Sequence, residues 1–439
     1  MKKLTILFVL IAIILSGCMS ASEHTIAGTS VANLYNIWET HYPDMVEDTA
    51  TATATKTVTL TPTRTPTNTA TNTATLTPTR TATSTFTITP SRTATLSPTS
   101  VFTPSRTPTG QVGGTHIYPG QSLQGAINNL KPGGVLYVHE GTYSSGTINV
   151  GVSDVTIIAD KAVVNYFDVG YWGVLFRISG SRVSISGFEI TGSDYMGVVV
   201  SGNNNIVSNF NVHHNGENGI LVTGDNNIIE NSKVWQNCRS NVDGTRTRGG
   251  WSSGLSAARR PSGTIIRHNE VYQNWGEGLS TYEADGTIIE FNEVYDNYVN
   301  VYISDAQDVI VRNNHVYIPT NPTVKIGSRA GIMLGDEKYN PASRNIQIAD
   351  NLVENTYRNL YWWQGTQGGS MNNVAIRGNT FVSSQYFAGV QINSASHQNV
   401  TFTNNTVTQG GGIQLMYVTC SQVSMTGNVW NGGNAPCKE

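Results

Sequence analysis

Residues 264–286 read TIIRHNEVYQNWGEGLSTYEADG, and residues 287–308 read TIIEFNEVYDNYVNVYISDAQD. The two stretches align from the first residue, which indicates an internal repeat. Each unit holds short alternating β runs separated by Gly, Asn and Asp, and it contains no helical segment. This pattern excludes leucine-rich, ankyrin and tetratricopeptide arrays. It predicts a parallel β-helix with one turn per unit and successive turns about 4.8 Å apart.

An asparagine placed two residues before a Val, Phe or Trp recurs through these units. The series is Asn269, Asn292, Asn314, Asn351, Asn379, Asn405 and Asn428. Its spacings are 23, 22, 37, 28, 26 and 23 residues, so the base unit is about 22 residues with insertions in some turns. We expect these side chains to lie at a bend and to bond to the backbone of neighbouring turns, which is a structural role.

Apolar residues fall into one column when the units are aligned. The column is Val198, Ile220, Leu255, Leu279, Val301, Ile332, Leu360, Val390 and Ile413. We expect these side chains to point inward and to stack. Residues 122–130, SLQGAINNL, read as a short amphipathic helix that would cover the open apolar end, as terminal caps must.

Residues 111–439 as a whole resemble the right-handed parallel β-helix proteins of the pectin-lyase-like superfamily. The passage from residue 122 through the turn at 132–134 into VLYV and GTY carries this resemblance together with the repeats. It implies an all-β, single-stranded right-handed parallel β-helix of about 11 coils with a short N-terminal capping helix. It implies no single activity, because the superfamily includes lyases, hydrolases, epimerases and non-enzymes.

The N-terminus predicts export and lipid attachment. Residues 1–17 combine Lys2 and Lys3 with an apolar stretch that is too short to span a bilayer, as in a signal peptide. The following LSGC at residues 15–18 resembles a bacterial lipobox, which implies lipidation of Cys18 and a membrane anchor. Residues 18–48 would form the lipidated N-terminal segment. Because Met19 and Ser20, and no acidic retention residue, come directly after Cys18, we expect an outward-facing, extracytoplasmic lipoprotein of the cell envelope.

Residues 49–110 predict a disordered linker between this anchor and the β-helix domain, residues 111–439. The stretch has 27 Thr and seven Pro in 62 residues, too few apolar side chains to offset the entropy of ordering. As an extended chain it would reach on the order of 190 Å. The net charge of the whole chain is −3, which gives no reason to expect nucleic acid as a partner. We expect a monomer.

Two insertions interrupt the repeat, at residues 237–252 and 318–329. Both enter just before a Gly-apolar strand, three turns apart, or roughly 14 Å. Insertions carry function more often than plain repeats do. We therefore expect two walls that project from the same edge and enclose a groove about three sugar units long.

Outward positions on the strands between the insertions predict a carbohydrate-binding surface, because exposed aromatic rings can stack on sugar faces while polar groups pair with hydroxyls and carboxylates. We expect an extracellular polysaccharide to contact Ser280, Tyr282, Tyr302, Tyr361, Trp363 and Trp251.

Arg259, Glu283, Asp305 and Asp336 follow these strands in one column. Stacked acids repel one another unless a cation or an arginine intervenes, and Ca²⁺ prefers oxygen ligands. Uronate lyases of the superfamily bind Ca²⁺ on one sheet and use Arg or Lys as base. That resemblance implies Glu283, Asp305 and Asp336 as Ca²⁺ ligands, Arg259, Arg260 or Lys338 as base, and Tyr302 or Tyr282 as acid. The alternative is a solvated ladder of charges with Arg259 as counter-ion.

The catalytic signature of a lyase family is not matched residue by residue, and the adjacent Asp-Asp pair of polygalacturonate hydrolases is absent. Two functions therefore stay open: a surface lipoprotein that binds and processes a polysaccharide in the manner of a uronate lyase, or a non-catalytic adhesive or structural module of the cell envelope. Cys420 and Cys437 could pair after export, which leaves Cys238 as a buried thiol.

Overall fold

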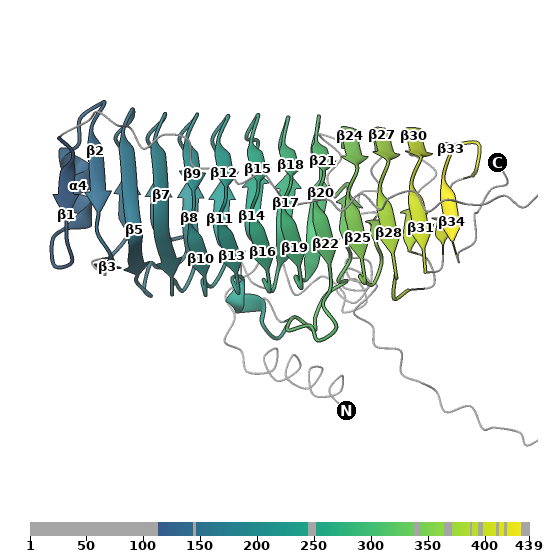
Figure 1. Cartoon of the computed structure of the whole chain (residues 1–439), viewed down its shortest axis with the longest axis horizontal. Coiled ribbons are helices and arrows are strands. Elements are labelled where there is room, and N and C mark those ends of the chain that lie inside the picture. The colour runs from purple at the N-terminus through teal and green to yellow at the C-terminus, as the bar shows by residue number, and fades with distance from the viewer. Residues whose placement is uncertain are drawn as a thin grey trace, which may run out of the picture. The chain divides into compact units, whose positions relative to one another are not determined.

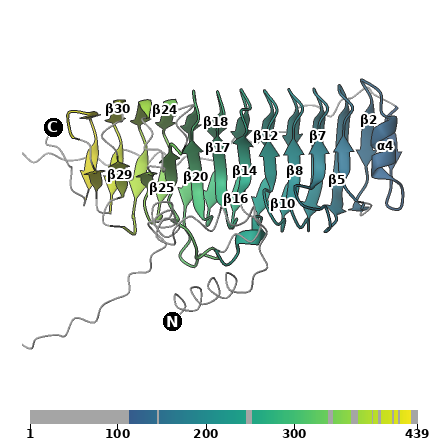
Figure 2. The ribbon, with the colours of Figure 1, turned by 180° about the vertical axis from the view of Figure 1, so that it is seen from behind.

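The computed structural model describes residues 113–431 except 144–145, 245–251, 338–342, 364–370, 387–388, 394–397, 410–411 and 417–418. This part of the chain winds as a parallel β-helix, with successive turns side by side along one axis (Figures 1 and 2). The predicted fold class is confirmed. The predicted signal peptide, the lipidated segment with Cys18 and the linker lie outside the described residues.

Each turn contributes one strand to an eleven-stranded sheet, which agrees with the expected number of coils. From the N-terminal end its strands are β4 (Ile148–Val150), β6 (Val174–Ile178), β8 (Met196–Val200), β11 (Ile220–Val222), β14 (Ser253–Ala258), β17 (Glu277–Tyr282), β20 (Val299–Ser304), β23 (Ile332–Gly335), β26 (Leu360–Trp362), β29 (Val390–Asn393) and β32 (Ile413–Met416).

The other strands form a 23-stranded sheet that continues around the turns. They are β1 (Thr115–Ile117), β2 (Val135–Val138), β3 (Gly141–Thr142), β5 (Thr156–Asn165), β7 (Ser184–Thr191), β9 (Ile206–Ser208), β10 (Asn211–His213), β12 (Ile228–Glu230), β13 (Lys233–Trp235), β15 (Ile265–Arg267), β16 (Glu270–Tyr272), β18 (Ile288–Glu290), β19 (Glu293–Tyr295), β21 (Ile310–Arg312), β22 (His315–Tyr317), β24 (Arg344–Ala349), β25 (Leu352–Glu354), β27 (Asn372–Arg377), β28 (Thr380–Val382), β30 (Gln398–Thr403), β31 (Thr406–Thr408), β33 (Val423–Thr426) and β34 (Val429–Asn431).

The predicted apolar column forms the core behind the eleven-stranded sheet. Leu255 pairs in register with Leu279, and Leu279 pairs with Val301. The same register runs from Val198 to Ile413, and every member of the column is buried. Alternation along each strand therefore turns the neighbouring side chains to the outer face.

The predicted asparagine series forms a buried ladder. Asn292 Nδ2 donates to Asn314 Oδ1 at 3.0 Å and to the backbone carbonyl of Ile266 in the preceding turn, also at 3.0 Å. The amide-to-amide bonds continue to Asn428. The bonds to backbone were expected. The bonds between side chains add a direct link from each turn to the next.

A second asparagine ladder, which was not predicted, lies next to the eleven-stranded sheet. It links Asn215, Asn237, Asn274, Asn297 and Asn300. Glycine at the start of the adjacent strands leaves room for these amides, because a Cβ at Gly278 would lie 2.5 Å from Asn297 Nδ2. The glycines at the start of these strands are therefore needed to make room for the second ladder.

Helix α4 (Leu123–Asn129) caps the N-terminal end as predicted. Ser122 is its N-cap and accepts a hydrogen bond from the Gly125 backbone, while Leu123 and Ile127 are buried against the end of the core. None of the helices in the described part of the chain has the length and apolar character needed to cross a membrane.

The described cysteines have different environments. Cys420 is disulfide-bonded, and its expected partner Cys437 lies outside the described residues. Cys238 is free and buried, as predicted. Burial, followed by the charges of Glu217 and Glu277, raises the pKa of its thiol well above the ordinary value. Cys238 is therefore an unreactive core residue.

Candidate functional site

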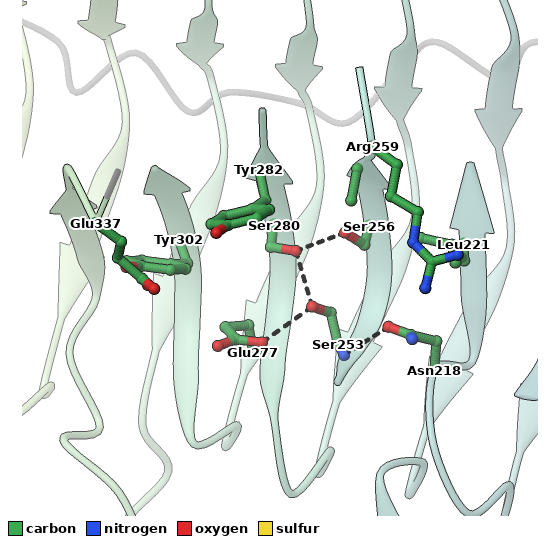
Figure 3. A pocket seen from close by; sticks show the side chains of 11 residues that line it. Asn218, Leu221, Ser253, Ser256, Arg259, Glu277, Ser280, Tyr282, Tyr302 and Glu337 are labelled. Atoms are coloured by element: carbon green, nitrogen blue, oxygen red, sulfur yellow. Dashed lines mark hydrogen bonds between the residues drawn. The ribbon is translucent and has the colours of Figure 1, made fainter. Parts of the chain in front are cut away.

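A cavity of about 280 Å³ opens on the outer face of the eleven-stranded sheet (Figure 3). It crosses β11, which precedes the first insertion, and β14, β17 and β20, which lie between the two insertions. Its lining residues are Asn218, Leu221, Ser253, Ser256, Ala258, Arg259, Glu277, Ser280, Tyr282, Tyr302 and Glu337. The cavity thus brings together the predicted residues Arg259, Ser280, Tyr282 and Tyr302 from three consecutive turns.

A row of hydroxyl groups forms the polar floor of the cavity. Ser280 Oγ lies 2.8 Å from both Ser253 Oγ and Ser256 Oγ. Ser253 Oγ donates to the Glu277 carboxylate at 3.0 Å (Figure 3). Because each hydroxyl can both donate and accept, the row can redirect its hydrogen bonds toward a bound ligand.

A second buried carboxylate, that of Glu217, lies next to the hydroxyl row. Glu217 accepts a hydrogen bond from Ser252 Oγ, and both residues are buried beside Cys238 and Glu277. Ser252 and Ser253 are adjacent, so their side chains connect the two carboxylates to the start of β14. Buried carboxylates held in this way give the floor a fixed geometry.

Tyr302 and Glu337 form the C-terminal end of the cavity. The Tyr302 hydroxyl donates to Glu337 Oε1 at 2.5 Å. The ring crosses the next strand, where a Cβ at Gly335 would lie 2.3 Å from the hydroxyl oxygen. Burial first, and then the Glu337 carboxylate, raises the pKa of Tyr302 well above its ordinary value. The hydroxyl therefore stays protonated and acts as a donor.

Arg259 supplies an exposed cation at the rim of the cavity, at the end of β14 (Figure 3). Arg259, Glu283 and Asp305 all have left-handed backbone, with φ of 72°, 50° and 51°. Their strands pair in register through Ala258, Tyr282 and Ser304, so the predicted column of charged residues lies on consecutive turns. A non-glycine residue in this conformation is uncommon, and three in one row define a fixed bend.

Two of the three acids of this column are buried, unlike the solvated ladder that was the alternative to a calcium site. Asp305 is 1% exposed and Asp336 is 2% exposed. Backbone N–H groups of Glu337 and Ser343 donate to Asp305 Oδ2 and Asp336 Oδ1 at 3.2 and 3.1 Å, whereas Asp336 Oδ2 is buried without a donor among the described residues. The two carboxyl groups can therefore hydrogen-bond to each other only when one of them is protonated. Burial, the main cause, and the nearby Asp305 raise the pKa of Asp336 to about 7.

The described column offers few oxygen ligands to a calcium ion. No cluster of three or more His, Cys, Asp or Glu side chains that could hold a metal ion occurs among the described residues. Within the described part of the chain, the column offers an ion one buried oxygen without a donor, Asp336 Oδ2, while Asp305 already accepts from Ser304 Oγ and from a backbone N–H group, and Glu283 is only half-buried. Calcium needs six to eight oxygen ligands, so the described column alone does not fit it. Calcium binding to the protein stays a prediction.

Two aromatic residues that were expected to be exposed are buried. Tyr302 and Tyr361 pack with Val299 and Ala330 in a small apolar cluster on the outer face. The Arg358 guanidinium carbon lies 4.4 Å from the centre of the Tyr361 ring and helps to cover it. Trp363 is half-buried against the same cluster. Tyr361 and Trp363 therefore lie outside the lining of the cavity, as Arg260 and Glu283 do.

The described parts of the two insertions meet, so they do not form separate walls. The second insertion folds toward earlier turns, where Thr323 and Val324 backbone N–H groups donate to Asp296 at 2.8 and 3.1 Å. A Cβ at Gly244 in the first insertion, next to η2 (Arg239–Asn241), would lie 3.9 Å from Ile326 in the second. Trp251 and Lys338 lie outside the described residues.

Residues 105–329 match the profile of the Pel9A-like right-handed β-helix region. The chain belongs to this family. The chain is thus a right-handed parallel β-helix of the pectin-lyase-like superfamily, as the resemblance implied. No curated protein sequence matches it.

Solved structures of low sequence identity share this fold. An exopolygalacturonase from Thermotoga maritima has a TM-score of 0.52 at 12% identity, covering 69% of this chain and 85% of its own. The A-module of the mannuronan C-5 epimerase AlgE6 from Azotobacter vinelandii has a TM-score of 0.50 at 15% identity, covering 72% and 94%. Pectate lyase Pel9A has a TM-score of 0.43 at 19% identity, covering 72% and 76%.

Proposed function

We propose that the β-helix domain binds an acidic extracellular polysaccharide, one that contains uronate units, in the cavity over β11, β14, β17 and β20. The observation that carries this proposal is the combination of one exposed cation, a row of hydroxyl groups and two tyrosines in one open cavity. Arginine binds carboxylates through paired N–H donors, while hydroxyls and Glu277 can exchange hydrogen bonds with sugar hydroxyls.

Replacing Arg259 by alanine is expected to weaken binding of polygalacturonate or polymannuronate at least tenfold, because a hydrogen bond to a charged group contributes about 1.5–3 kcal/mol. Isothermal titration at low and high salt measures this, with dextran as the neutral ligand. The matched control is Arg377→Ala, which removes the same charge from an exposed position in β27, on the other sheet. Equal affinity of the Arg259 and Arg377 variants would contradict the proposal.

A specific contact favours processing as a second candidate function. In β-elimination a base removes the C5 proton of a uronate, the C4–O bond breaks and the leaving oxygen takes up a proton. Tyr302 keeps its proton and points it at Glu337 in the cavity, which suits the acid of this step. Of the two predicted bases within the described residues, Arg259 lines the cavity and Arg260 does not.

Product formation, measured with the same ligands as binding, separates the two functions. A lyase would release unsaturated products, which are followed by ultraviolet absorbance, and Tyr302→Phe should then abolish the product while binding is kept. Tight binding without product would show the adhesive or structural module.

We further propose that Cys18 carries the lipid anchor and that residues 49–110 hold a monomeric domain away from the membrane. Detergent partitioning of a Cys18→Ser variant measures the anchor.

A further inference from the structure

The loop between β5 and β6 carries large aromatic side chains exposed to solvent. Phe167 is 69% exposed, Tyr171 is 65% exposed and Trp172 is 56% exposed. Single exposed apolar residues are ordinary, but neighbouring exposed rings on one loop mark an interaction site. This loop belongs to none of the features that the proposed function uses.

The loop is held in place by the next turn. The backbone N–H of Asp194 donates to the carbonyl of Phe167 at 2.9 Å, and Asp194 Oδ1 accepts from Val169 N–H at 3.1 Å. Trp172 has left-handed backbone with φ of 63°, which is rare for a bulky residue and requires support from its surroundings. The exposed rings therefore stand on a fixed frame.

Both rings rest on a buried tyrosine. The ring centres of Tyr171 and Trp172 each lie 5.5 Å from that of Tyr195, and the Trp172 ring meets it edge to face. Tyr195 itself belongs to an apolar cluster on the outer face of the eleven-stranded sheet, with Val174, Met196, Val199 and Leu221. These contacts orient the rings and leave more than half of each side chain open to solvent.

This aromatic pair is continuous with the cavity. The Arg259 guanidinium carbon lies 5.7 Å from the centre of the Trp172 ring. Arg259 and Leu221 also line the cavity, where the arginine side chain extends toward Leu221 (Figure 3). One cation therefore joins the polar floor of the cavity to the exposed rings.

Stacked aromatic rings elsewhere on the domain have a different arrangement. On the 23-stranded sheet Tyr272 stacks on Tyr295 at 4.9 Å, and Tyr295 stacks on Tyr317 at 4.8 Å. Those faces are covered by each other, and all three side chains are half-buried. Such a ladder joins turns of the fold, whereas Tyr171 and Trp172 offer surface to a ligand.

We propose that Tyr171 and Trp172 form a sugar-stacking subsite that extends the cavity toward the N-terminal turns, with Arg259 binding a uronate carboxylate between the two. An apolar sugar face covers an aromatic ring well, and the rim arginine adds charge recognition. This inference rests on the proposed function. It adds that the affinity depends on oligosaccharide length, because only a ligand that spans both the cavity and the rings of Tyr171 and Trp172 gains the stacking contact.

The test uses oligogalacturonates and oligomannuronates of two to eight units with the whole protein. We expect affinity to rise with length until the ligand covers both places. Trp172→Ala and Tyr171→Ala should each bind the disaccharide as the unchanged protein does but bind the longest ligand about tenfold more weakly, which is about 1.4 kcal/mol. The matched control is Phe167→Ala, an exposed ring on the same loop.

The outcomes separate this inference from the function on which it rests. Unchanged length dependence in both variants, with tight binding of long ligands, would overturn the subsite and leave the cavity intact. An equal loss at all lengths would also overturn it, since it would mean a general structural effect. If no ligand bound the unchanged protein, the proposed function itself would fail. Tyr171 has ordinary backbone, so its variant stays informative if Trp172→Ala unfolds the loop.

Discussion

Replacing Asn292 by alanine is expected to lower the free energy of unfolding by ~4 kcal/mol. The side chain is buried: the two hydrogens of its Nδ2 are shared among the carbonyls of Ile266 and Glu290 and Oδ1 of Asn314, and its Oδ1 accepts from the backbone and the side chain of Asn269. Truncation leaves several of these buried groups without a partner, at a cost of about 1–3 kcal/mol each before relaxation. Urea unfolding followed by circular dichroism measures the change.

The control for this variant is another asparagine that bonds between turns at the surface. Asn372 Oδ1 accepts from Asn399 Nδ2 at 2.9 Å, and Asn372 is exposed. Because water can replace that contact, Asn372→Ala should cost less than about 1 kcal/mol. Similar small losses at both positions would show that the buried ladder does not hold the turns together.

The stability that Asp336 contributes to the domain is expected to fall as pH rises from about 4 to about 7. Asp336 has a folded pKa of about 7 against an ordinary value of 3.8, so the folded protein binds more protons than the unfolded chain in this window. Stability decreases with pH wherever the folded state binds more protons. The contribution of the protonated pair is therefore complete below the unfolded pKa and lost above the folded one.

Asp336→Asn should remove most of this dependence, because the amide resembles a protonated carboxyl group. It can still accept from Ser343 N–H and donate to Asp305. We expect the variant to melt close to the unchanged protein at pH 4 and at a clearly higher temperature at pH 8. Asp350→Asn, at a half-exposed carboxylate near Arg377, should leave the pH dependence as it was. A destabilised Asp336→Asn protein at pH 8 would contradict this account.

The same melting experiment tests calcium. An ion bound by Asp305 and Asp336 would favour their ionised forms, so calcium would raise the melting temperature at pH 8 and Asp336→Asn would abolish the rise. The geometry of the described column leads us to expect no such rise, because among the described residues no third acidic side chain joins Asp305 and Asp336, and both already accept from backbone N–H groups.

The repeat alone predicted most of the fold. Spacing places Leu255, Leu279 and Val301 in one buried register, because side chains alternate strictly along a strand. The asparagine before each apolar residue likewise located the first ladder. The second ladder was missed because Asn297 and Asn300 are three residues apart, which breaks the repeat that the first ladder follows.

The site was predicted less completely, because it depends on contacts between turns. If side chains alternated strictly along β17, Glu277 would point inward, because Ser280, three residues later, points outward. Glu277 instead lines the cavity together with Ser280. The burial of Tyr302 comes from neighbours such as Ala330, which lies in another turn after an insertion. The sequence contained one usable signal for Glu277: an acid directly before the small residue that begins the apolar strand.

Crystals of the protein soaked with a tetragalacturonate or a tetramannuronate test the central claim most directly. We expect the sugar over the outer face of β14, β17 and β20, with one carboxylate on Arg259 and hydroxyl groups on Ser280 and Glu277. An oligosaccharide bound instead on the 23-stranded sheet, with the cavity filled by water alone, would contradict the account.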